Sequence, residues 1–527
     1  MKRIASSDLR LGLLFSLTFI VLLSLFFDFV LDDSFITYRY AENFAHGEGI
    51  RWNVGEDPVE GFTSFLWVAL NALAILLRFD PVIFSKLLSG IAGLAIIWML
   101  LATKSNLDWR LKYIFVASIA LSPPFTFILI QGMETALTTF LLFLSALLSV
   151  KILRYSDKRY VFLWYCIAIL GFLARPDSIT FNTGILAGLI ILFVINKNTS
   201  MIKTIIAYGA IFLVIGALYN VWRVSYFGYT FPNTFYVKFS SSNYIFTLQG
   251  IYYLFTFVIK IMLPYLLLCA FLIYKNFNKE KFSITIPMLT GFSFYCIYLM
   301  TIYPVQGFLW RFAFPVYPAF ILAALLLFSE VKLSAFPLLK KLPVVMAILI
   351  VFTIWPLRLL NFAMLQKEGR TQHDRVMMGK SLAGIDGTMF VSESGALPFY
   401  SKWKAADLLG LNSEEIVHNG LSEQILLSLN PDLVMMLFHG PYKEEPEYED
   451  NFILNKYMIE NNFVAVAVVR RYTNSFHFYF VRRNSELFDE IAERLLSVDN
   501  IEYANMHEFL EEHRIPIYDF EPREAIN

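Results

Sequence analysis

Charged residues are scarce in this sequence. Only 16% of its 527 residues are Asp, Glu, Lys or Arg, whereas 57% are hydrophobic and 17% are aromatic. Basic and acidic residues number 43 each, so no charge imbalance points to nucleic acid as a partner. A chain this apolar differs from ordinary soluble proteins and is typical of a protein whose helices cross a lipid bilayer repeatedly.

Cysteine is also rare, and nucleotide-binding motifs and internal repeats are missing. Cys166, Cys269 and Cys296 lie inside apolar segments and lack the spacing of metal ligands. Residues 384–387, Gly-Ile-Asp-Gly, are a turn signal and do not form a glycine-rich phosphate loop. The two halves of the chain share no repeat, which argues against a transporter built from duplicated helix bundles.

The chain does contain many apolar segments. The first, residues 11–31, has about the 20 residues that a membrane-spanning helix needs, and the basic residues before it predict a cytoplasmic N-terminus. A signal peptide is the alternative, but the run is long and no small-residue cleavage site follows it. Further apolar segments cover residues 62–77, 82–103, 113–130, 136–150, 160–173, 179–195, 204–222, 251–274, 283–301, 309–328 and 342–358.

The number of spans is predicted from the loops that carry Lys and Arg, since such loops face the cytoplasm. Twelve spans would return the chain to the cytoplasm, but the pattern of Lys and Arg places the exit of the last segment outside. We therefore expect about 11 transmembrane helices, with one early segment that does not span. Residues 62–77 are short for a span, and residues 113–130 are interrupted by Ser122-Pro123-Pro124, so either segment could be re-entrant or broken.

A soluble composition begins near residue 359. The sequence predicts strands at residues 388–391, 433–437, 463–469 and 476–481, and helices at residues 414–429 and 486–496. The expected fold is a polytopic α-helical membrane domain of residues 1–358, with an interfacial loop at residues 32–61. An extracytoplasmic α/β domain of residues 359–527 follows it.

Two adjacent acids, Asp32 and Asp33, follow the first apolar segment. The next residues predict an amphipathic helix along the membrane surface, which Asp33 or Ser34 caps and which Gly47 and Gly49 end. Ionised groups at a membrane interface are costly unless they face water, a partner or a substrate. The pair is therefore a candidate site.

Several motifs carry a family resemblance. Residues 32–67, including DDSFITYRYA, GIRWNVGE and PVEGFTSFLW, resemble the N-terminal signature of GT-C membrane glycosyltransferases. They are most similar to mycobacterial-type terminal β-(1→2) arabinofuranosyltransferases, which use a polyprenyl-phosphate sugar. Further similar segments, in order, are residues 132–135, 175–177, 226–228, 232–238, 311–318, 393–401 and 407–411. This chain departs from the group at Glu393-Ser394, where many members have an acid directly before the Gly-Ala element.

The resemblance implies a GT-C glycosyltransferase in the cytoplasmic (inner) membrane, with its active site and C-terminal domain outside the cytoplasm. It would move a sugar, with arabinofuranose as one candidate, from a polyprenyl-phosphate donor to a cell-envelope glycan or glycolipid acceptor. Asp32 would be the general base, and Asp33 would orient the acceptor or cap its helix. The implied donor-phosphate ligands are Arg311, Lys238 and Arg175, and the implied substrate-binding residues are Glu60, Glu134, Asp177, Trp52 and Asn233.

A lipid monophosphate donor does not demand a metal, so the sequence predicts no obligatory cofactor and leaves a divalent ion at the two acids open. The basic residues have structural alternatives. Arg175 could pair with Asp177 at the interface, Lys238 could anchor the chain there, and Arg311 could stack in an aromatic belt. Glu134 could simply complement a helix dipole. For the whole chain, a transporter or flippase of lipid-linked sugars and a non-catalytic lipid-glycan binding subunit remain open.

Overall fold

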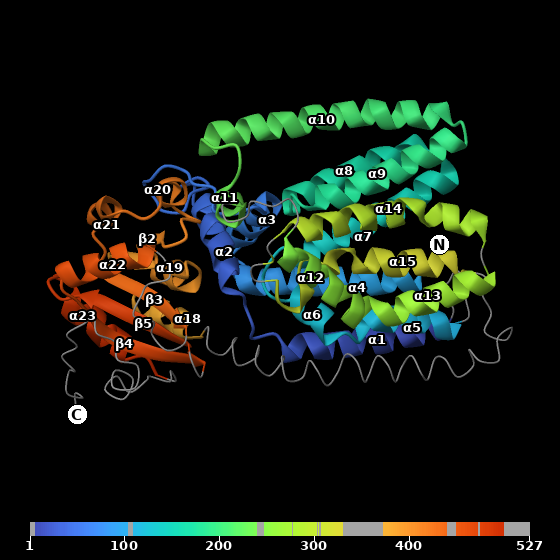
Figure 1. The fold of residues 1–527 in the computed structure, drawn as a ribbon. Coiled ribbons are helices and arrows are strands. Elements are labelled where there is room, and N and C mark those ends of the chain that lie inside the picture. Colours follow the sequence, from blue (N-terminus) through green and yellow to red (C-terminus); the bar gives the residue numbers. More distant parts are fainter. Residues whose placement is uncertain are drawn as a thin grey trace.

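A helical bundle and a small sheet domain lie side by side in the computed structural model (Figure 1). The structure describes residues 6–103, 109–239, 247–276, 278–302, 304, 307–329, 373–439, 449–472 and 475–499. The predicted span at residues 342–358 and the predicted domain boundary at residues 358 and 359 lie outside these residues.

The bundle contains the apolar helices that the sequence predicts. Its elements are α1 (Ser6–Leu25), α2 (Asp32–Ala45), α3 (Phe65–Leu76), α4 (Pro81–Leu101), α5 (Trp109–Ala120), α6 (Pro123–Leu129), α7 (Thr135–Tyr155), α8 (Lys158–Ala174), α9 (Ser178–Ile195), α10 (Thr199–Phe227), α11 (Asn233–Phe239), α12 (Leu248–Phe257), the π-helical turn η1 (Val258–Met262), α13 (Leu263–Asn276), α14 (Lys279–Thr301), the 3-10 turns η2 (Phe308–Trp310) and η3 (Phe314–Val316), and α15 (Tyr317–Leu327).

Six helices in the described residues are long and apolar enough to cross a membrane, or seven if the bent pair α5 and α6 is one span. The chain is therefore a polytopic helical membrane protein, but the predicted count of about 11 spans is not confirmed. Three other apolar helices, Leu9–Leu25, Phe65–Leu76 and Phe314–Leu327, have fewer than 18 residues. The predicted break is confirmed, because α5 and α6 meet at 47° where Ser122 caps α6 ahead of two prolines.

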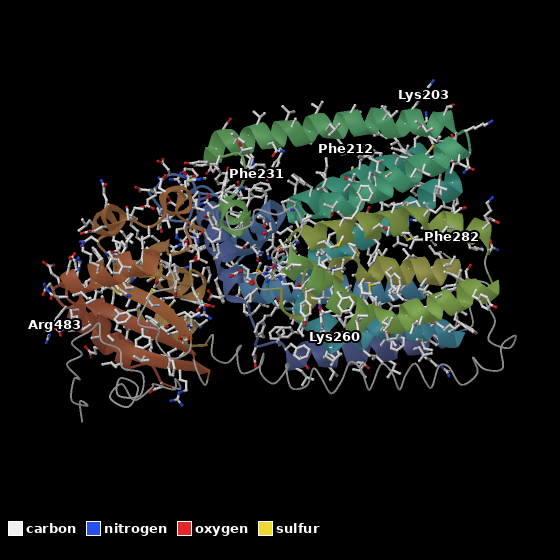
Figure 2. The ribbon with its side chains drawn as sticks, viewed as in Figure 1. Lys203, Phe212, Phe231, Lys260, Phe282 and Arg483 are labelled. Carbon is white, nitrogen blue, oxygen red and sulfur yellow. The ribbon has the colours of Figure 1, made fainter. Side chains whose placement is uncertain are left out.

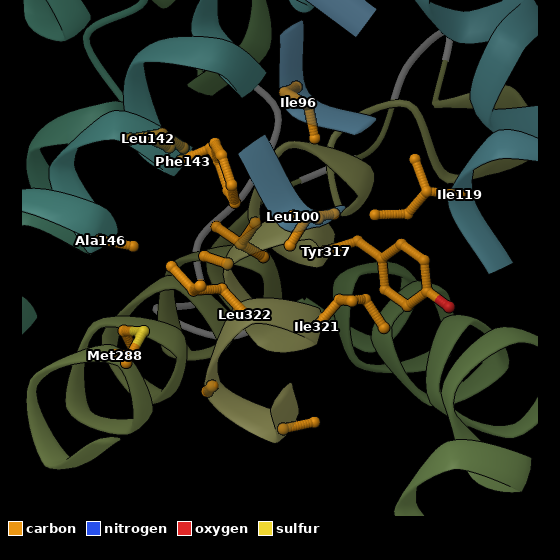
Figure 3. Packing of buried hydrophobic residues seen from close by; sticks show 14 of the residues in the cluster. Ile96, Leu100, Ile119, Leu142, Phe143, Ala146, Met288, Tyr317, Ile321 and Leu322 are labelled. Carbon is orange, nitrogen blue, oxygen red and sulfur yellow. The ribbon is translucent and has the colours of Figure 1, made fainter. Parts of the chain in front are cut away.

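The centre of the bundle is a close-packed apolar core. Leu100 from α4, Phe143 from α7, Met288 from α14, and Tyr317 and Leu322 from α15 belong to one cluster of buried side chains (Figure 3). Burying apolar surface stabilises the fold by about 25 cal/mol per Å². This core holds in place the helices whose ends carry the polar residues described below.

α10 lies along one side of the bundle, over α8 and α9 (Figure 1). An apolar cavity of about 510 Å³ separates these three helices, and Trp164, Phe172 and Phe212 are among its lining residues. Among the described residues, no charged side chain lines this cavity. The candidate site is therefore not in the cavity.

The C-terminal part is a five-stranded mixed sheet with helices around it. Its elements are α18 (His373–Ser381), β1 (Thr388–Val391), α19 (Ala396–Ser401), β2 (Lys404–Asp407), α20 (Glu414–Asn419), α21 (Glu423–Leu429), β3 (Leu433–His439), α22 (Glu449–Glu460), β4 (Phe463–Tyr472), β5 (Ser475–Arg482) and α23 (Phe488–Leu496). The strand order is β2-β1-β3-β5-β4, with β2, β1 and β3 parallel and β5 antiparallel to both of its neighbours. The four predicted strands are confirmed, and β2 was not predicted.

α2 joins the bundle to the sheet domain. One cluster of buried apolar side chains includes Tyr40 and Trp52 from the N-terminal region and Leu397, Trp403 and Tyr479 from the sheet domain. The predicted helix after the two acids is confirmed, but it is packed between the two parts of the protein and is not simply laid on the membrane surface.

The predicted cap of α2 is wrong. Leu31 is the N-cap residue, and Asp32 and Asp33 both lie in the first helical turn, where their charges complement the helix dipole. Their side chains are thus available for contacts with other elements.

Candidate functional site

Asp32 binds the sheet domain. Its carboxylate oxygens accept hydrogen bonds from the backbone amides of Gly395 and Ala396, each at 3.0 Å, and Asp32 is only 7% exposed. Arg375 Nη1 from α18 lies 3.3 Å from the same carboxylate. Both oxygens of the predicted base are therefore occupied by groups of another domain.

The contacts of Asp32 continue into a buried charge network. Arg375 Nη1 lies 2.6 Å from Glu393 Oε2, and the same Glu393 oxygen lies 2.8 Å from His477 Nε2. The other ring nitrogen of His477 lies 2.6 Å from Asp374 Oδ2, which also accepts a hydrogen bond from the Tyr479 hydroxyl. Through these contacts, α18, strand β5 and the loop that follows β1 all meet the N-terminal end of α2.

Burial and charge act in opposite directions in this network. Burial raises the pKa of Asp32, and the charge of Arg375 only partly opposes that rise. Burial alone would lower the pKa of His477, but the carboxylates of Asp374 and Glu393 outweigh burial and raise it. The network therefore favours a protonated His477 held between two carboxylates.

A second contact between the domains is built on Arg39. Its guanidinium donates to the backbone oxygens of Trp52, Pro398 and Trp403, and its Cζ atom lies 4.4 Å from the Trp52 ring centroid. Trp52 is 1% exposed, and its indole donates to the Ala405 backbone oxygen at 2.8 Å. Trp52, which the sequence suggested as a substrate ligand, is thus placed in the domain contact.

The turn before α7 ties the start of α2 to the membrane bundle. The Ser34 hydroxyl donates to the Gln131 backbone oxygen, and the Tyr38 hydroxyl and the Trp67 indole both donate to the Gly132 backbone oxygen. Gly132 has a φ of +90°, and a Cβ atom there would come within 2.6 Å of the Tyr38 hydroxyl. Glycine is therefore required, and the turn carries Glu134 next to α2.

Three of the predicted site residues meet beside this turn. Arg175, at the end of α8, lies 3.1 Å from Glu134 Oε1 and 2.7 Å from Asp177 Oδ2. The predicted pairing of Arg175 with Asp177 is present, but all three side chains are at most 11% exposed. This is a buried ion cluster, in contrast to the interfacial anchor that was the alternative for Arg175.

Arg311 adds a second guanidinium to the same region. Its Cζ atom and that of Arg175 each lie 5.2 Å from the Phe312 ring centroid, so both contact one aromatic side chain. Arg311 is 5% exposed, and its Nε and Nη1 atoms have no hydrogen-bond partner among the described residues. Asp33 and Glu134 both lie near enough to act on it electrostatically.

Several other polar groups near the two arginines also have atoms without a partner. In the part of the chain that the structure describes, buried polar atoms without a hydrogen bond occur in the side chains of Gln131, Glu134, Thr135, Thr138 and Ser178. Buried polar groups in folded proteins are nearly always satisfied. We call this region the polar centre, defined by Gln131, Glu134, Thr135, Thr138, Arg175, Asp177, Ser178 and Arg311.

Glu60 lies in a third group. It pairs with Arg223 at the end of α10, while its backbone oxygen accepts from the Asn233 amide and the Asn233 side chain donates to the Gly410 backbone oxygen. Burial raises the pKa of Glu60 to about 7, although Arg223 opposes the rise. Glu60 and Asn233 thus connect α10 to the sheet domain.

The predicted site residues therefore fall into three places. Arg175, Glu134, Asp177 and Arg311 meet in the polar centre, and Asp33 acts on it. Asp32 and Trp52 bind the sheet domain, and Glu60 and Asn233 form the third group. Lys238 belongs to α11, and its side chain lies outside the described residues.

Sequence reasoning missed the partners of these residues. Arg375, Arg223, Arg39 and His477 are each more than 90% buried and charged or titratable, yet each stands in an ordinary amphipathic context along the chain.

Together the bundle and sheet define a polytopic membrane protein with a C-terminal α/β domain. Residues 365–481 match a family model described as a domain of unknown function (DUF8728). The match covers Arg375, Glu393 and His477 and leaves out the membrane bundle. No curated protein matches the chain significantly.

Proposed function

We propose that this protein is a membrane glycosyltransferase of the GT-C type that uses a polyprenyl-phosphate sugar as its donor. The observation that carries the proposal is Arg311, a buried cation with two nitrogen atoms unpartnered among the described residues. A buried charge without a partner is costly, and a planar guanidinium matches the free oxygens of a phosphate ester, whose charge grows as the sugar leaves. Arg311 is therefore assigned to the donor phosphate.

The neighbours of Arg311 support the same reaction. Arg175 already has two carboxylate partners, so it positions Glu134 and Asp177 and leaves the phosphate to Arg311. The unpartnered hydroxyl and amide groups of the polar centre match the many hydroxyl groups of a sugar. Polar groups inside a membrane bundle are costly unless they bind a substrate, and the polar headgroup of a lipid-linked sugar is a substrate of this kind.

Asp33 is a better general base than Asp32. The carboxylate of Asp32 accepts hydrogen bonds from two backbone amides and lies beside Arg375, so it is engaged with the sheet domain. Asp33 is the neighbour on the same helical turn and interacts electrostatically with Arg311. The base that the sequence placed at Asp32 is therefore proposed at Asp33, and Asp32 becomes a domain contact.

The proposed step balances without a further reactant. The acceptor hydroxyl oxygen forms a bond to the anomeric carbon, and the bond from that carbon to the phosphate oxygen breaks. Asp33 takes the hydroxyl proton, and the electron pair leaves on the polyprenyl phosphate, whose added charge Arg311 stabilises. The acceptor is a cell-envelope glycan or glycolipid, reached from outside the cytoplasmic membrane with the N-terminus in the cytoplasm.

Native mass spectrometry of the detergent-extracted protein tests the proposal. Wild type should retain a polyprenyl phosphate or its sugar adduct, Arg311→Met should lose it, and the control Arg159→Met should keep it, since Arg159 is exposed and pairs only locally with Asp157. A bound lipid-linked oligosaccharide in place of the monophosphate would favour a flippase. Equal lipid retention by Arg311→Met would contradict the proposed donor site.

A further inference from the structure

A lysine lies exposed in the middle of a candidate membrane span. Lys260 belongs to the span Leu248–Tyr274, and it follows Leu248 by about 18 Å of helix at 1.5 Å per residue. Its side chain is exposed, and Figure 2 shows it on the α12–α13 segment of the bundle. A cation at this depth is costly unless an anion or a polar path accompanies it.

The helix is distorted where Lys260 lies. Residues Val258–Met262 form the π-helical turn η1 between α12 and α13, and Lys260 is its central residue. Single π turns inside α-helices occur frequently at functional sites, because the extra residue redirects the side chains. Here Ile261 and Met262 are buried while Lys260 remains exposed.

Trp310 contacts Lys260 and directly precedes Arg311 in the chain. The Lys260 ammonium lies 5.8 Å from the centroid of the Trp310 ring, and the Trp310 indole donates to the Thr256 hydroxyl at 2.9 Å. The next residue is Arg311, whose side chain is buried in the polar centre. The exposed Lys260 therefore contacts Trp310, and Trp310 is followed in the chain by the buried Arg311.

The backbone at this point is strained. Leu309 and Trp310 have φ values of 52° and 57°, in the left-handed region that bulky residues rarely adopt. Two such residues in succession are unfavourable and persist only where surrounding contacts impose them. Strain of this kind is concentrated at ligand sites.

These residues also lie below the membrane surface. The backbone amide and hydroxyl of Thr247 bind the oxygens of Met300 and Ile302, so the start of α12 is level with the end of α14. Trp310 binds Thr256, about 14 Å further along the helix at 1.5 Å per residue. Irregular backbone at membrane depth is tolerated only where protein buries it or where it lines a polar cavity.

We propose that Lys260 and Trp310 form a lateral entry through which the phosphate of a polyprenyl-phosphate donor passes from the bilayer to Arg311. Lys260 attracts the anionic phosphodiester of the lipid donor at the lipid surface, and Trp310 separates this first position from the final one. The identity of the lipid rests on the function proposed above. The entry itself rests on the exposed lysine, the π turn, the strained Trp310 and the buried Arg311.

The test measures binding of a long-chain polyprenyl monophosphate to the whole protein in nanodiscs. Lys260→Met should slow association about tenfold or more and raise the KM for the lipid donor, while kcat stays unchanged. Lys203→Met is the matched control, because Lys203 is an exposed lysine on α10 at the far end of the bundle from the sheet domain (Figure 2). A water-soluble short-chain prenyl phosphate should bind both variants equally, since it need not come from the lipid.

The outcomes separate the two proposals. If Lys260→Met takes up the long-chain lipid at the wild-type rate, the entry is overturned and the donor site stands. If neither wild type nor any variant binds either phosphate, the proposed function fails and the entry with it. If phosphatidate competes equally with the polyprenyl lipid, the proposed occupant is wrong. Methionine is apolar and of similar length, so Lys260→Met should fold; an unchanged melting temperature verifies this.

Discussion

The carboxylate of Asp32 accepts a hydrogen bond from the backbone amide of Gly395, 363 residues further along the chain. A Cβ atom on Gly395 would overlap both the carboxylate and the backbone oxygen of Asp32. The position is therefore restricted to glycine by a residue of the membrane domain, which makes the contact between the two domains an integral part of the fold.

Gly395→Ala should weaken this contact. The added methyl forces α2 and the loop before α19 apart, and overpacking of this kind costs about 1–3 kcal/mol. We expect a lower melting temperature and faster proteolysis between the two domains. Gly216→Ala is the control, because a Cβ atom there meets nothing within 4 Å. Identical melting temperatures for the two variants would show that the Asp32 contact contributes little.

The two adjacent acids should respond differently to substitution. Asp33→Asn removes the proposed base and should abolish sugar transfer with little change in melting temperature. Asp32→Asn leaves buried amides and Arg375 without a full charge partner, so we expect a loss of about 1–3 kcal/mol of stability and partial activity. Transfer assays and thermal unfolding of both variants in nanodiscs decide this; full activity of Asp33→Asn would exclude it as the base.

His477 should make stability depend on pH. Its pKa is raised in the folded protein, so its contribution is fully present below its ordinary value near 6.5 and is lost as the pH rises through the folded value. The groups facing it are Asp374, Glu393, Arg375 and Tyr479. The melting-temperature difference between wild type and His477→Gln should be largest below pH about 6.5 and shrink as the pH rises above that value. A constant difference would mean that His477 is not charged in the fold.

Glu60 and Arg223 should behave as a coupled pair. Arg223→Met leaves a buried carboxyl without its partner and should cost about 3–5 kcal/mol, whereas the double variant with Glu60→Gln should recover most of that loss. Because burial raises the pKa of Glu60 to about 7, its stabilising contribution is complete below its ordinary 4.5 and is lost as the pH passes about 7. Thermal unfolding at pH about 5.5 and 8 measures both effects. If the stability loss of the double variant equals the sum of the losses of the two single variants, the two residues are not coupled.

Local patterns predicted local structure well. Short apolar segments rich in β-branched and aromatic residues identified β1, β3, β4 and β5, and the two prolines after Ser122 predicted the break between α5 and α6. The single helix predicted for residues 414–429 is in fact two, α20 and α21, because Gly420 has a φ of +78° and ends the first. β2 escaped prediction because its four residues, Lys404–Asp407, read Lys-Ala-Ala-Asp and include none of the β-branched or aromatic side chains that favour strands.

The site was harder to predict because its contacts are not local. The sequence marked Arg311, Arg175 and the two acids as unusual in an apolar chain, and the structure shows that Arg311 and Arg175 meet. Nothing near Asp32 indicated that Arg375 and the Gly395 amide would occupy it. Exposed residues such as Lys260 are equally hard to place, since a lysine in an apolar segment does not show which way it faces.

Arg39 has a consequence for how the chain is made. It is buried, yet it donates to the backbone oxygens of Pro398 and Trp403, which are 359 and 364 residues further on. At about 5–20 residues per second of synthesis, Arg39 waits roughly 20–70 seconds for these partners. Membrane insertion of the helices between them must therefore finish while α2 still lacks its docking surface. One of the earliest helices of the chain becomes one of the last to reach its native contacts.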